Sequence, residues 1–279
     1  MPELPEVETV RRGLQPRLVG KRIVRLQQRR KDLRIPLPAK FAARVEGRTV
    51  RAIDRRAKYL LIRLDNDETL IAHLGMSGRM TLHDAASAAG HPLDRHDHVV
   101  FDVDDGWQVR FNDARRFGLM LLVPDAAVAA HKFFKGLGPE PLDDSFDGPA
   151  LASRLVGRKT PIKAALLDQK TLVGVGNIYA CEALFLAGIS PRRSAHTVQG
   201  ERAEKLVAAI KRVLARSIED GGSTLRDHVQ PGGELGYFQT RFNVYDRAGI
   251  ACPTRGCGRT VKRLVQAGRS TFYCAHCQR

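Results

Sequence analysis

The sequence predicts an α+β protein in which an N-terminal antiparallel β-sandwich with flanking helices precedes a helical region and a short cysteine-rich ribbon. Three observations predict this fold class. Short apolar runs recur between residues 20 and 125, the apolar spacing turns helical beyond residue 150, and four of the five cysteines fall within the last 28 residues. A chain of 279 residues is long enough for more than one core, so we expect two domains rather than one.

The opening stretch MPELPEVETV predicts a helix that packs against the sandwich. Pro5 suits the first helical turn, because it lacks the amide hydrogen that would have no partner there. Glu6 and Glu8 interact favourably with the positive end of the helix dipole. Helix initiation does not explain Pro2 and Glu3.

Five β-like runs follow, separated by polar or glycine-containing turns. Several of them alternate between apolar and polar residues, and their spacing suits an antiparallel sandwich or barrel. Residues 84–95 contain alanine, serine, glycine and proline and predict a mobile loop. The runs are KYLLIRL (58–64), TLIAHL (69–74), HVVFDV (98–103), WQVRF (107–111) and FGLMLLV (117–123).

A composition change marks the domain boundary. Residues 136–149 hold three prolines and three glycines without periodicity, which predicts a linker. Helical spacing follows over 177–188 and over a long amphipathic run that closes at Gly221-Gly222. We therefore predict an N-terminal sandwich domain over 1–130, a linker over 131–150, a helical domain over 151–236 and a ribbon over 237–279.

Four cysteines form a C-x4-C-x16-C-x2-C pattern near the C-terminus. Two close pairs separated by an insert of hairpin length suit tetrahedral zinc, and a reducing cytosol disfavours disulfides. Because all four ligands would be thiolates, we expect one structural Zn2+ ion with no open catalytic position. A redox pair or unligated thiols are the alternative. The expected ligands are Cys252, Cys257, Cys274 and Cys277, and the fifth cysteine, Cys181, should be buried.

The net charge of +16 is concentrated at both ends of the chain. Residues 1–60 carry 17 basic and 6 acidic side chains, and residues 241–279 carry 8 and 1. Two separated basic segments are typical of a protein that binds a polyanion, and nucleic acid fits this pattern better than an anionic membrane. The sequence shows neither a signal peptide nor the roughly 20 apolar residues of a membrane span, so we expect a cytosolic protein.

The start Met-Pro-Glu allows covalent chemistry. Removal of the initiator methionine before a small residue would leave Pro2 with a free secondary amine. An α-amino group has a pKa of about 7.7–8.0, so part of it is neutral at physiological pH. A neutral secondary amine attacks an aldehyde-like carbon to give an iminium, and Glu3 is placed to move a proton. Many proteins begin Met-Pro, so this pattern alone does not define an activity.

Further motifs along the chain carry a resemblance to a known family. They are PELPEVETV (2–10), RRAKYLL (55–61), HLGMSGRM (73–80), RHDHV (95–99), DARRFG (113–118), VGVGNIYACEALF (173–185) and the terminal ribbon. Together they resemble bacterial formamidopyrimidine-DNA glycosylases, also called 8-oxoguanine DNA glycosylases, over essentially the whole chain. The resemblance implies that the helical domain is a helix-two-turn-helix DNA-binding domain. Leu4 favours this family over the sister endonuclease VIII-like family.

The resemblance implies a bifunctional DNA repair enzyme. It would excise oxidised purines, such as 8-oxoguanine and formamidopyrimidines, and cleave the abasic strand by β,δ-elimination. Pro2 would form a Schiff base at the sugar C1′, and Glu3 would protonate the opening sugar. Lys58 matches the proton donor in β-elimination, with a phosphate-contacting strand lysine as the alternative. Arg269 matches the arginine assigned to δ-elimination, although a bidentate phosphate clamp suits a guanidinium better, because it barely deprotonates.

The resemblance also implies a set of DNA contacts. A base inside a duplex must be extruded before it is excised, and the gap must be filled. Met76, Arg115 and Phe117 match the residues that fill it, with strand core as the alternative for Met76 and Phe117. On flexibility alone, residues 223–236 are expected to sense the lesion. His96 matches a further DNA-contacting position, with a structural strand histidine as the alternative. Asn177 would begin a helix whose backbone amides can bind phosphate, and Lys159 and Lys163 would add positive charge there.

Two rival functions stay open. One is an endonuclease VIII-like glycosylase for oxidised pyrimidines, and the other is a zinc-ribbon DNA-binding protein without catalysis. For a formamidopyrimidine-DNA glycosylase and for an endonuclease VIII-like glycosylase alike, the partner would be double-stranded DNA with oxidised bases or abasic sites. No membrane partner is expected. We expect a monomer in the bacterial cytosol, because one chain supplies every part that the reaction needs.

Overall fold

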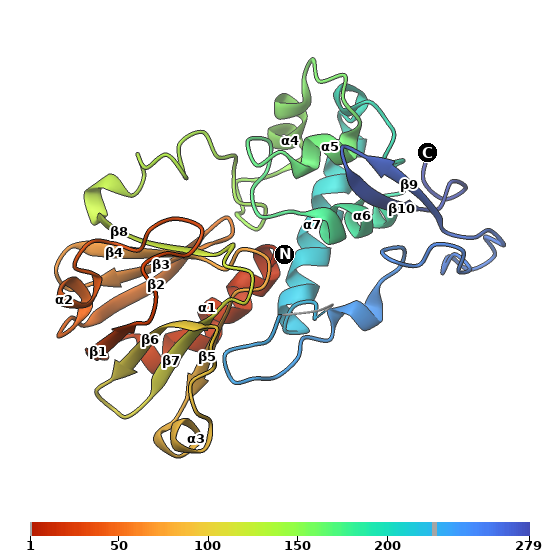
Figure 1. The fold of residues 1–279 in the computed structure, drawn as a ribbon. Helices are drawn as coiled ribbons and strands as arrows, with labels where there is room; N and C mark the ends of the chain where they lie inside the picture. Colours follow the sequence, from red (N-terminus) through yellow and green to blue (C-terminus); the bar gives the residue numbers. More distant parts are fainter. Residues whose placement is uncertain (1, 225–227) are drawn as a thin grey trace. The chain divides into compact units, whose positions relative to one another are not determined.

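A computed structural model describes residues 2–224 and 228–279. The chain forms two compact units (Figure 1). Unit 1 contains Met1–Lys135 and Asp220–Tyr237, and unit 2 contains Gly136–Glu219 and Phe238–Arg279. The later segment of unit 1 lies within the region expected to be helical, so the domain bounds given above stay a prediction. No helix in the described ranges is long and apolar enough to cross a membrane.

Unit 1 is built on two four-stranded antiparallel sheets. One sheet has the strand order β1-β6-β7-β5, and the other has the order β2-β3-β4-β8. Apolar residues from both sheets share one core, as expected for a sandwich. The strands are β1 (Ile23–Gln28), β2 (Val50–Arg56), β3 (Tyr59–Leu64), β4 (Glu68–His73), β5 (Arg79–His83), β6 (Asp97–Val103), β7 (Gln108–Asn112) and β8 (Leu119–Pro124).

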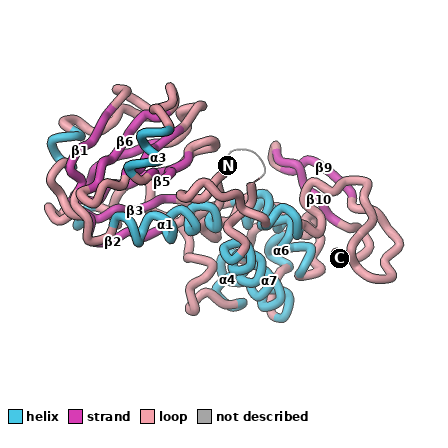
Figure 2. Tube along the Cα trace, turned by 90° about the horizontal axis from the view of Figure 1, so that it is seen from below, coloured by secondary structure: helices cyan, strands magenta, loops and turns pink. Residues whose placement is uncertain are grey.

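Short helices complete unit 1. Helix α1 (Leu4–Leu18) lies along β2 and β3 and contributes apolar side chains to the shared core (Figure 2). The segment expected to be a mobile loop instead contains α3 (Ala85–Gly90). This helix forms because the Asp84 carboxylate caps it, accepting a hydrogen bond from the backbone N of Ser87 at 2.7 Å. The others are α2 (Phe41–Val45) and the 3-10 turn η1 (Asp125–Ala127).

Unit 2 is helical and carries the ribbon. The amphipathic run forms α7, whose buried face includes Leu206, Ile210 and Leu214. The Ser217 hydroxyl on the same face is hydrogen-bonded to the Tyr179 hydroxyl at 2.7 Å. The helices are α4 (Gly148–Leu155), α5 (Ile162–Leu167), α6 (Asn177–Leu186), α7 (Glu201–Glu219) and the 3-10 turns η2 (Ala195–Thr197) and η3 (Phe238–Arg241), and the ribbon strands are β9 (Lys262–Gln266) and β10 (Arg269–Tyr273).

The ribbon has a small core of its own with α6. Cys181 of α6 is 1% exposed and packs with Val244, Val261 and Phe272, so the prediction that this thiol is buried is confirmed. The predicted fold class is likewise confirmed, with antiparallel sheets first, helices next and a cysteine-rich ribbon last.

Candidate functional site

The N-terminal segment is held in place by a reciprocal cap on α1. Pro2 is buried, and Glu3 is 4% exposed. The backbone N of Glu3 donates to the Glu6 carboxylate at 2.8 Å, and the Glu3 carboxylate accepts from the backbone N of Glu6. A capping box of this kind satisfies amides that a helix leaves unbonded. It fixes the backbone next to Pro2.

Glu6 also binds a segment more than 200 positions away in the chain. Its second carboxylate oxygen accepts from the backbone N of Ser223 at 2.9 Å. Gly222 has φ +84°, and a Cβ there would lie 3.0 Å from Nε2 of His228 and 3.3 Å from Cγ of Glu6. Burial lowers the pKa of His228, and the charge of Glu6 opposes that shift. The sequence pattern gave no sign of this link, because it joins distant parts of the chain.

The segment expected to sense the lesion, residues 223–236, returns to unit 1 and packs beside α1. Residues 225–227 lie outside the described residues. Pro231 packs against α1, since a Cβ at Gly13 would lie 2.7 Å from its ring. The assignment of this segment as a sensor stays a prediction.

Lys58 lies in the turn between β2 and β3 and is 7% exposed. The turn is tied to α1, because Arg55 donates to the Glu8 carboxylate at 3.2 Å and to the carbonyl of Ala57 at 3.0 Å. Burial alone would raise the pKa of Glu8, but hydrogen bonds from Arg11 and Arg12 and the charge of Arg55 lower it to about 2. The turn that carries Lys58 is therefore anchored by an ionised carboxylate at neutral pH.

His73 is a neutral neighbour of Lys58. Burial, and then the charges of Lys58 and Arg34, lower the pKa of His73 to about 4. Its Nδ1 accepts a hydrogen bond from the backbone N of Gly75 at 2.9 Å, which leaves the ring proton on Nε2. His73 is thus uncharged at physiological pH and adds no second cation beside Lys58.

Met76, Arg115 and Phe117 are brought together by two loops of unit 1. The Arg115 guanidinium lies 4.9 Å from the centre of the Phe117 ring and 3.4 Å from the sulfur of Met76. The Phe117 side chain is 45% exposed, so it does not belong to the strand core. An exposed apolar residue stacked on an arginine fits a surface that contacts another molecule.

His96 lies close to these loops through the backbone. It is half-buried, and its carbonyl accepts from the backbone N of Asp113 at 3.1 Å. Its Nε2 accepts from Nε of Arg95 at 3.0 Å. The other histidine of the motif, His98, is 1% exposed and donates to the carbonyl of Asp113 at 2.8 Å, so it has a structural part.

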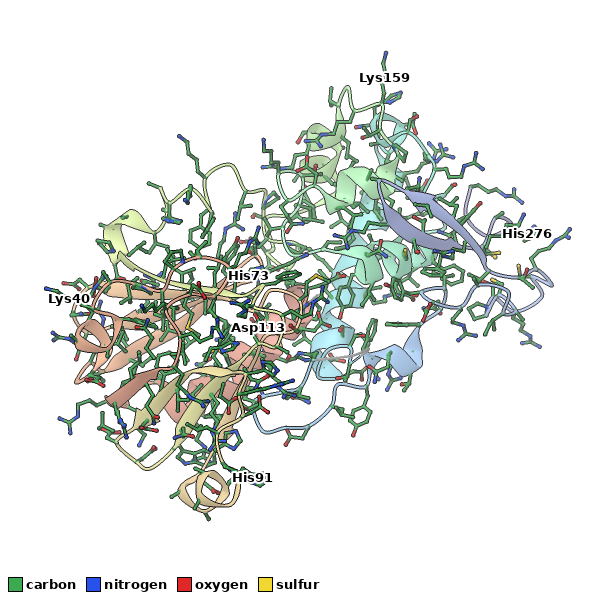
Figure 3. The ribbon with its side chains drawn as sticks, viewed as in Figure 1. Lys40, His73, His91, Asp113, Lys159 and His276 are labelled. Carbon is green, nitrogen blue, oxygen red and sulfur yellow. The ribbon has the colours of Figure 1, made fainter. Side chains whose placement is uncertain are left out.

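The expected phosphate-binding residues of unit 2 take different positions. Lys159 is exposed and projects away from its helices (Figure 3). Lys163 is 1% exposed, and its ammonium donates to the carbonyl of Ser270 at 3.0 Å and to the Thr271 hydroxyl at 2.7 Å. The charge of Lys163 is thus used inside the unit, and its expected direct contact with DNA stays a prediction.

Asn177 and Lys163 bind the same carbonyl. Asn177 begins α6, and its side-chain amide donates to Ser270 at 2.9 Å. Ser270 directly follows Arg269, which is exposed at the start of β10. Two donors from the helical part thus fix the backbone beside Arg269.

A buried carboxylate holds the chain that enters the ribbon. Glu182 of α6 is 1% exposed and accepts from the backbone N atoms of Asn243, Val244 and Tyr245 at 2.9, 2.9 and 2.8 Å. Glu182 was not among the residues predicted from the sequence, although a single charge within the apolar stretch NIYACEALF is a usable signal.

The four ribbon cysteines form a metal site. Their Sγ atoms all lie within 4.8 Å of one another. Four thiolates that converge in this way fit one tetrahedral zinc ion and leave no position for a substrate. The four-residue gap of the first pair closes in a turn, with the backbone N of Cys257 donating to the carbonyl of Thr254 at 3.0 Å. His276 lies exposed between two of the ligands (Figure 3).

Comparison with protein families covers both units. Residues 1–120 match the formamidopyrimidine-DNA glycosylase N-terminal domain, and residues 137–229 match the helix-two-turn-helix domain of the same enzymes. Residues 249–279 match a zinc finger found in these glycosylases and in IleRS. The chain belongs to the formamidopyrimidine-DNA glycosylase family.

Similar proteins agree with this membership. A formamidopyrimidine-DNA glycosylase of Beijerinckia indica is 54% identical over the whole of both chains. The MutM (Fpg) protein from Thermus thermophilus has a TM-score of 0.86 at 41% identity, covering 99% of this chain and 98% of that chain. The Fpg of Lactococcus lactis, solved in complex with DNA containing an abasic site, has a TM-score of 0.87 at 33% identity over 99% of each chain.

Three expectations are confirmed by the formamidopyrimidine-DNA glycosylase membership. The chain is an enzyme of this family, with the lyase activity characteristic of it, rather than a ribbon protein without catalysis. The ribbon is a zinc finger, and its four cysteines are placed for one structural zinc ion. The helical region includes the helix-two-turn-helix domain.

Proposed function

We propose that the protein excises oxidised purines, such as 8-oxoguanine and formamidopyrimidines, from duplex DNA and then cleaves the abasic strand. The observation that carries this proposal is the fixed N-terminal segment. Pro2 and Glu3 are both buried, and the backbone N of Glu3 donates to the Glu6 carboxylate. The names of the similar proteins and the abasic-site DNA bound to the Lactococcus lactis relative support the same substrate class.

The proposed reaction starts at the nitrogen of Pro2, freed by removal of Met1. The amine attacks the sugar C1′, and the bond to the damaged base breaks, so the base leaves with the bonding electrons and takes up a proton. Glu3 protonates the ring oxygen as the sugar opens, which leaves an iminium between Pro2 and C1′. The iminium acidifies the C2′ proton, and its loss expels the 3′ phosphate. A second elimination expels the 5′ phosphate, and water then hydrolyses the Schiff base and restores the amine.

Lys58 and Arg269 are assigned to the elimination steps. Lys58 would supply a proton during β-elimination. Arg269 would bind the phosphates that flank the lesion, because a guanidinium offers two parallel donors to phosphate. His96, Lys159 and Asn177 would add further DNA contacts.

Met76, Arg115 and Phe117 are proposed to fill the gap left by the extruded nucleotide. An apolar side chain inserted between base pairs replaces lost stacking, and an arginine offers donors to the orphaned base. The mutual contacts of these three side chains support this role.

Borohydride trapping tests the proposed function. Wild-type protein is incubated with duplexes that contain 8-oxoguanine, thymine glycol or an abasic site, and borohydride is added. We expect a stable protein–DNA crosslink with the 8-oxoguanine and abasic duplexes and a much weaker one with thymine glycol, because the proposed covalent intermediate is a reducible iminium. A crosslink that forms best with thymine glycol would favour an endonuclease VIII-like enzyme.

Lys163→Met tests whether this lysine acts through Arg269 rather than on DNA. The substitution removes the donors to Ser270 and Thr271 but keeps the side-chain length. We expect it to weaken binding to abasic duplex about tenfold, the scale of one lost hydrogen bond between the Arg269 guanidinium and a phosphate. When it is combined with Arg269→Ala, the two losses should not add, because both act on the same contact.

The matched control for Lys163 is Lys159→Met, which removes an exposed charge. Its loss should add to that of Arg269→Ala, as expected for independent phosphate contacts. Fully additive losses for Lys163→Met, measured by fluorescence anisotropy, would contradict the indirect role.

A further inference from the structure

The loops that carry Met76 and Phe117 are packed backbone against backbone. Gly75 has φ +64°, and a Cβ there would lie 2.3 Å from the carbonyl carbon of Phe117. A Cβ at Gly118 would lie 2.8 Å from the carbonyl oxygen of His73. A side chain at either glycine would therefore push the two loops apart.

One buried carboxylate bonds to both loops. Asp113 is fully buried, and one of its oxygens accepts from the Ser77 hydroxyl at 2.6 Å, while the other accepts from the backbone N of Gly118 at 2.7 Å. Ser77 in turn accepts from the backbone N of Arg115 at 3.3 Å. Asp113 thus bonds directly to the neighbour of Met76 and to the neighbour of Phe117, and through Ser77 to Arg115.

The backbone of Asp113 is itself fixed by the adjoining strand. Its amide donates to the carbonyl of His96 at 3.1 Å, and its carbonyl accepts from His98 at 2.8 Å. The carboxylate therefore projects from a rigid position. An ionised carboxylate accepts at both oxygens, whereas an asparagine accepts at only one.

We propose that Asp113 is a positioning residue that sets the spacing of Met76, Arg115 and Phe117 before DNA binds. This inference rests on the proposed role of those three residues in filling the gap left by the extruded nucleotide. Extrusion costs free energy because the base is unstacked and unpaired. Side chains that already lie at the right spacing lose little further freedom when they insert, so they do not add to that cost. The hydrogen bonds of Asp113 to Ser77 and to the backbone N of Gly118 hold the two loops at this spacing.

Two substrates separate this role from general damage to the protein. Excision from an 8-oxoguanine duplex requires the gap to be filled, whereas crosslinking to an abasic single strand does not, because no opposite strand is present. Ser77→Ala and Asp113→Asn should each slow single-turnover excision from the duplex about tenfold or more, the scale of a lost hydrogen bond to a charged group. Borohydride crosslinking to the single strand should stay within about twofold of wild type.

Thr69→Val is the matched control. Thr69 is buried in β4 of the same unit, and its hydroxyl bonds to the Asp125 carboxylate. Its substitution also removes a buried bond between a hydroxyl and a carboxylate, yet it should leave the ratio of duplex to single-strand activity unchanged.

The possible outcomes are distinguishable. Equal losses on both substrates for Ser77→Ala and Asp113→Asn would overturn the positioning role, as would unchanged duplex excision. A wild-type protein that crosslinks to neither substrate would instead refute the proposed function, and the inference with it.

Discussion

Blocking the nitrogen of Pro2 should abolish the crosslink to abasic DNA and lower strand cleavage by at least about 10³-fold, as expected when a covalent nucleophile is lost. The substitution Pro2→Leu achieves this block, because initiator methionine is usually retained before a bulky residue. The nitrogen of position 2 then becomes part of a peptide bond and no longer attacks carbon. Mass spectrometry establishes whether Met1 is present, and gel analysis of trapped DNA measures the crosslink.

Pro2→Gly is the control for the blocked terminus. Glycine permits removal of Met1 and leaves a primary amine at the same position, so part of the crosslink should remain. Both variants keep Glu3 and Glu6, whose mutual hydrogen bonds form the cap of α1. If the chain with Met1 attached cleaved abasic DNA at the wild-type rate, Pro2 could not be the nucleophile.

Loss of zinc should have the second-largest effect. Structural zinc in small zinc-finger domains contributes about 10–16 kcal/mol at neutral pH, far more than the apolar core of such a short segment. In this chain that core consists of Cys181, Val244, Val261 and Phe272. Without the ion we expect the ribbon to unfold, and Arg269 at the start of β10 to lose its fixed position.

Cys277→Ala tests the zinc prediction. We expect zinc below one equivalent by metal analysis and a crosslink to abasic duplex reduced by about 100-fold or more, the scale of a misplaced positioning group. Cys181→Ala removes a thiol that packs beside the ribbon but is not one of the four clustered ligands, and it should retain both zinc and activity. A zinc-free Cys277→Ala protein with wild-type crosslinking would contradict a structural need for the ion.

The sequence predicted the fold class because its strongest signals are local. The five β-like runs form strands in the structure. They were predictable because the apolar residues of each strand lie within one short stretch of sequence. Strands β1, β2 and β5 were not among those runs. Only two of six positions in β1 and one of five in β5 are buried, and β2 carries three arginines. Pairing with neighbouring strands, rather than an apolar pattern, therefore defines these three strands.

The residues of the candidate site were predictable where each lies within a short, recognisable motif. Met76, Arg115 and Phe117 were grouped from the resemblance, and the structure places them in contact. Lys163 was expected to add positive charge at the helix start of Asn177. Its burial depends on Ser270 and Thr271, more than 100 positions later, which no local pattern reveals.

The chain path of unit 1 limits how the enzyme can be recombined. Because Asp220–Tyr237 returns to unit 1, exchanging only Met1–Lys135 between relatives would combine segments of two parents within this one unit, including the contact between Glu6 and Ser223. Chimeras should therefore be built with two crossover regions. The same path means that the first 135 residues, expressed as a fragment, would lack a piece of their own folding unit.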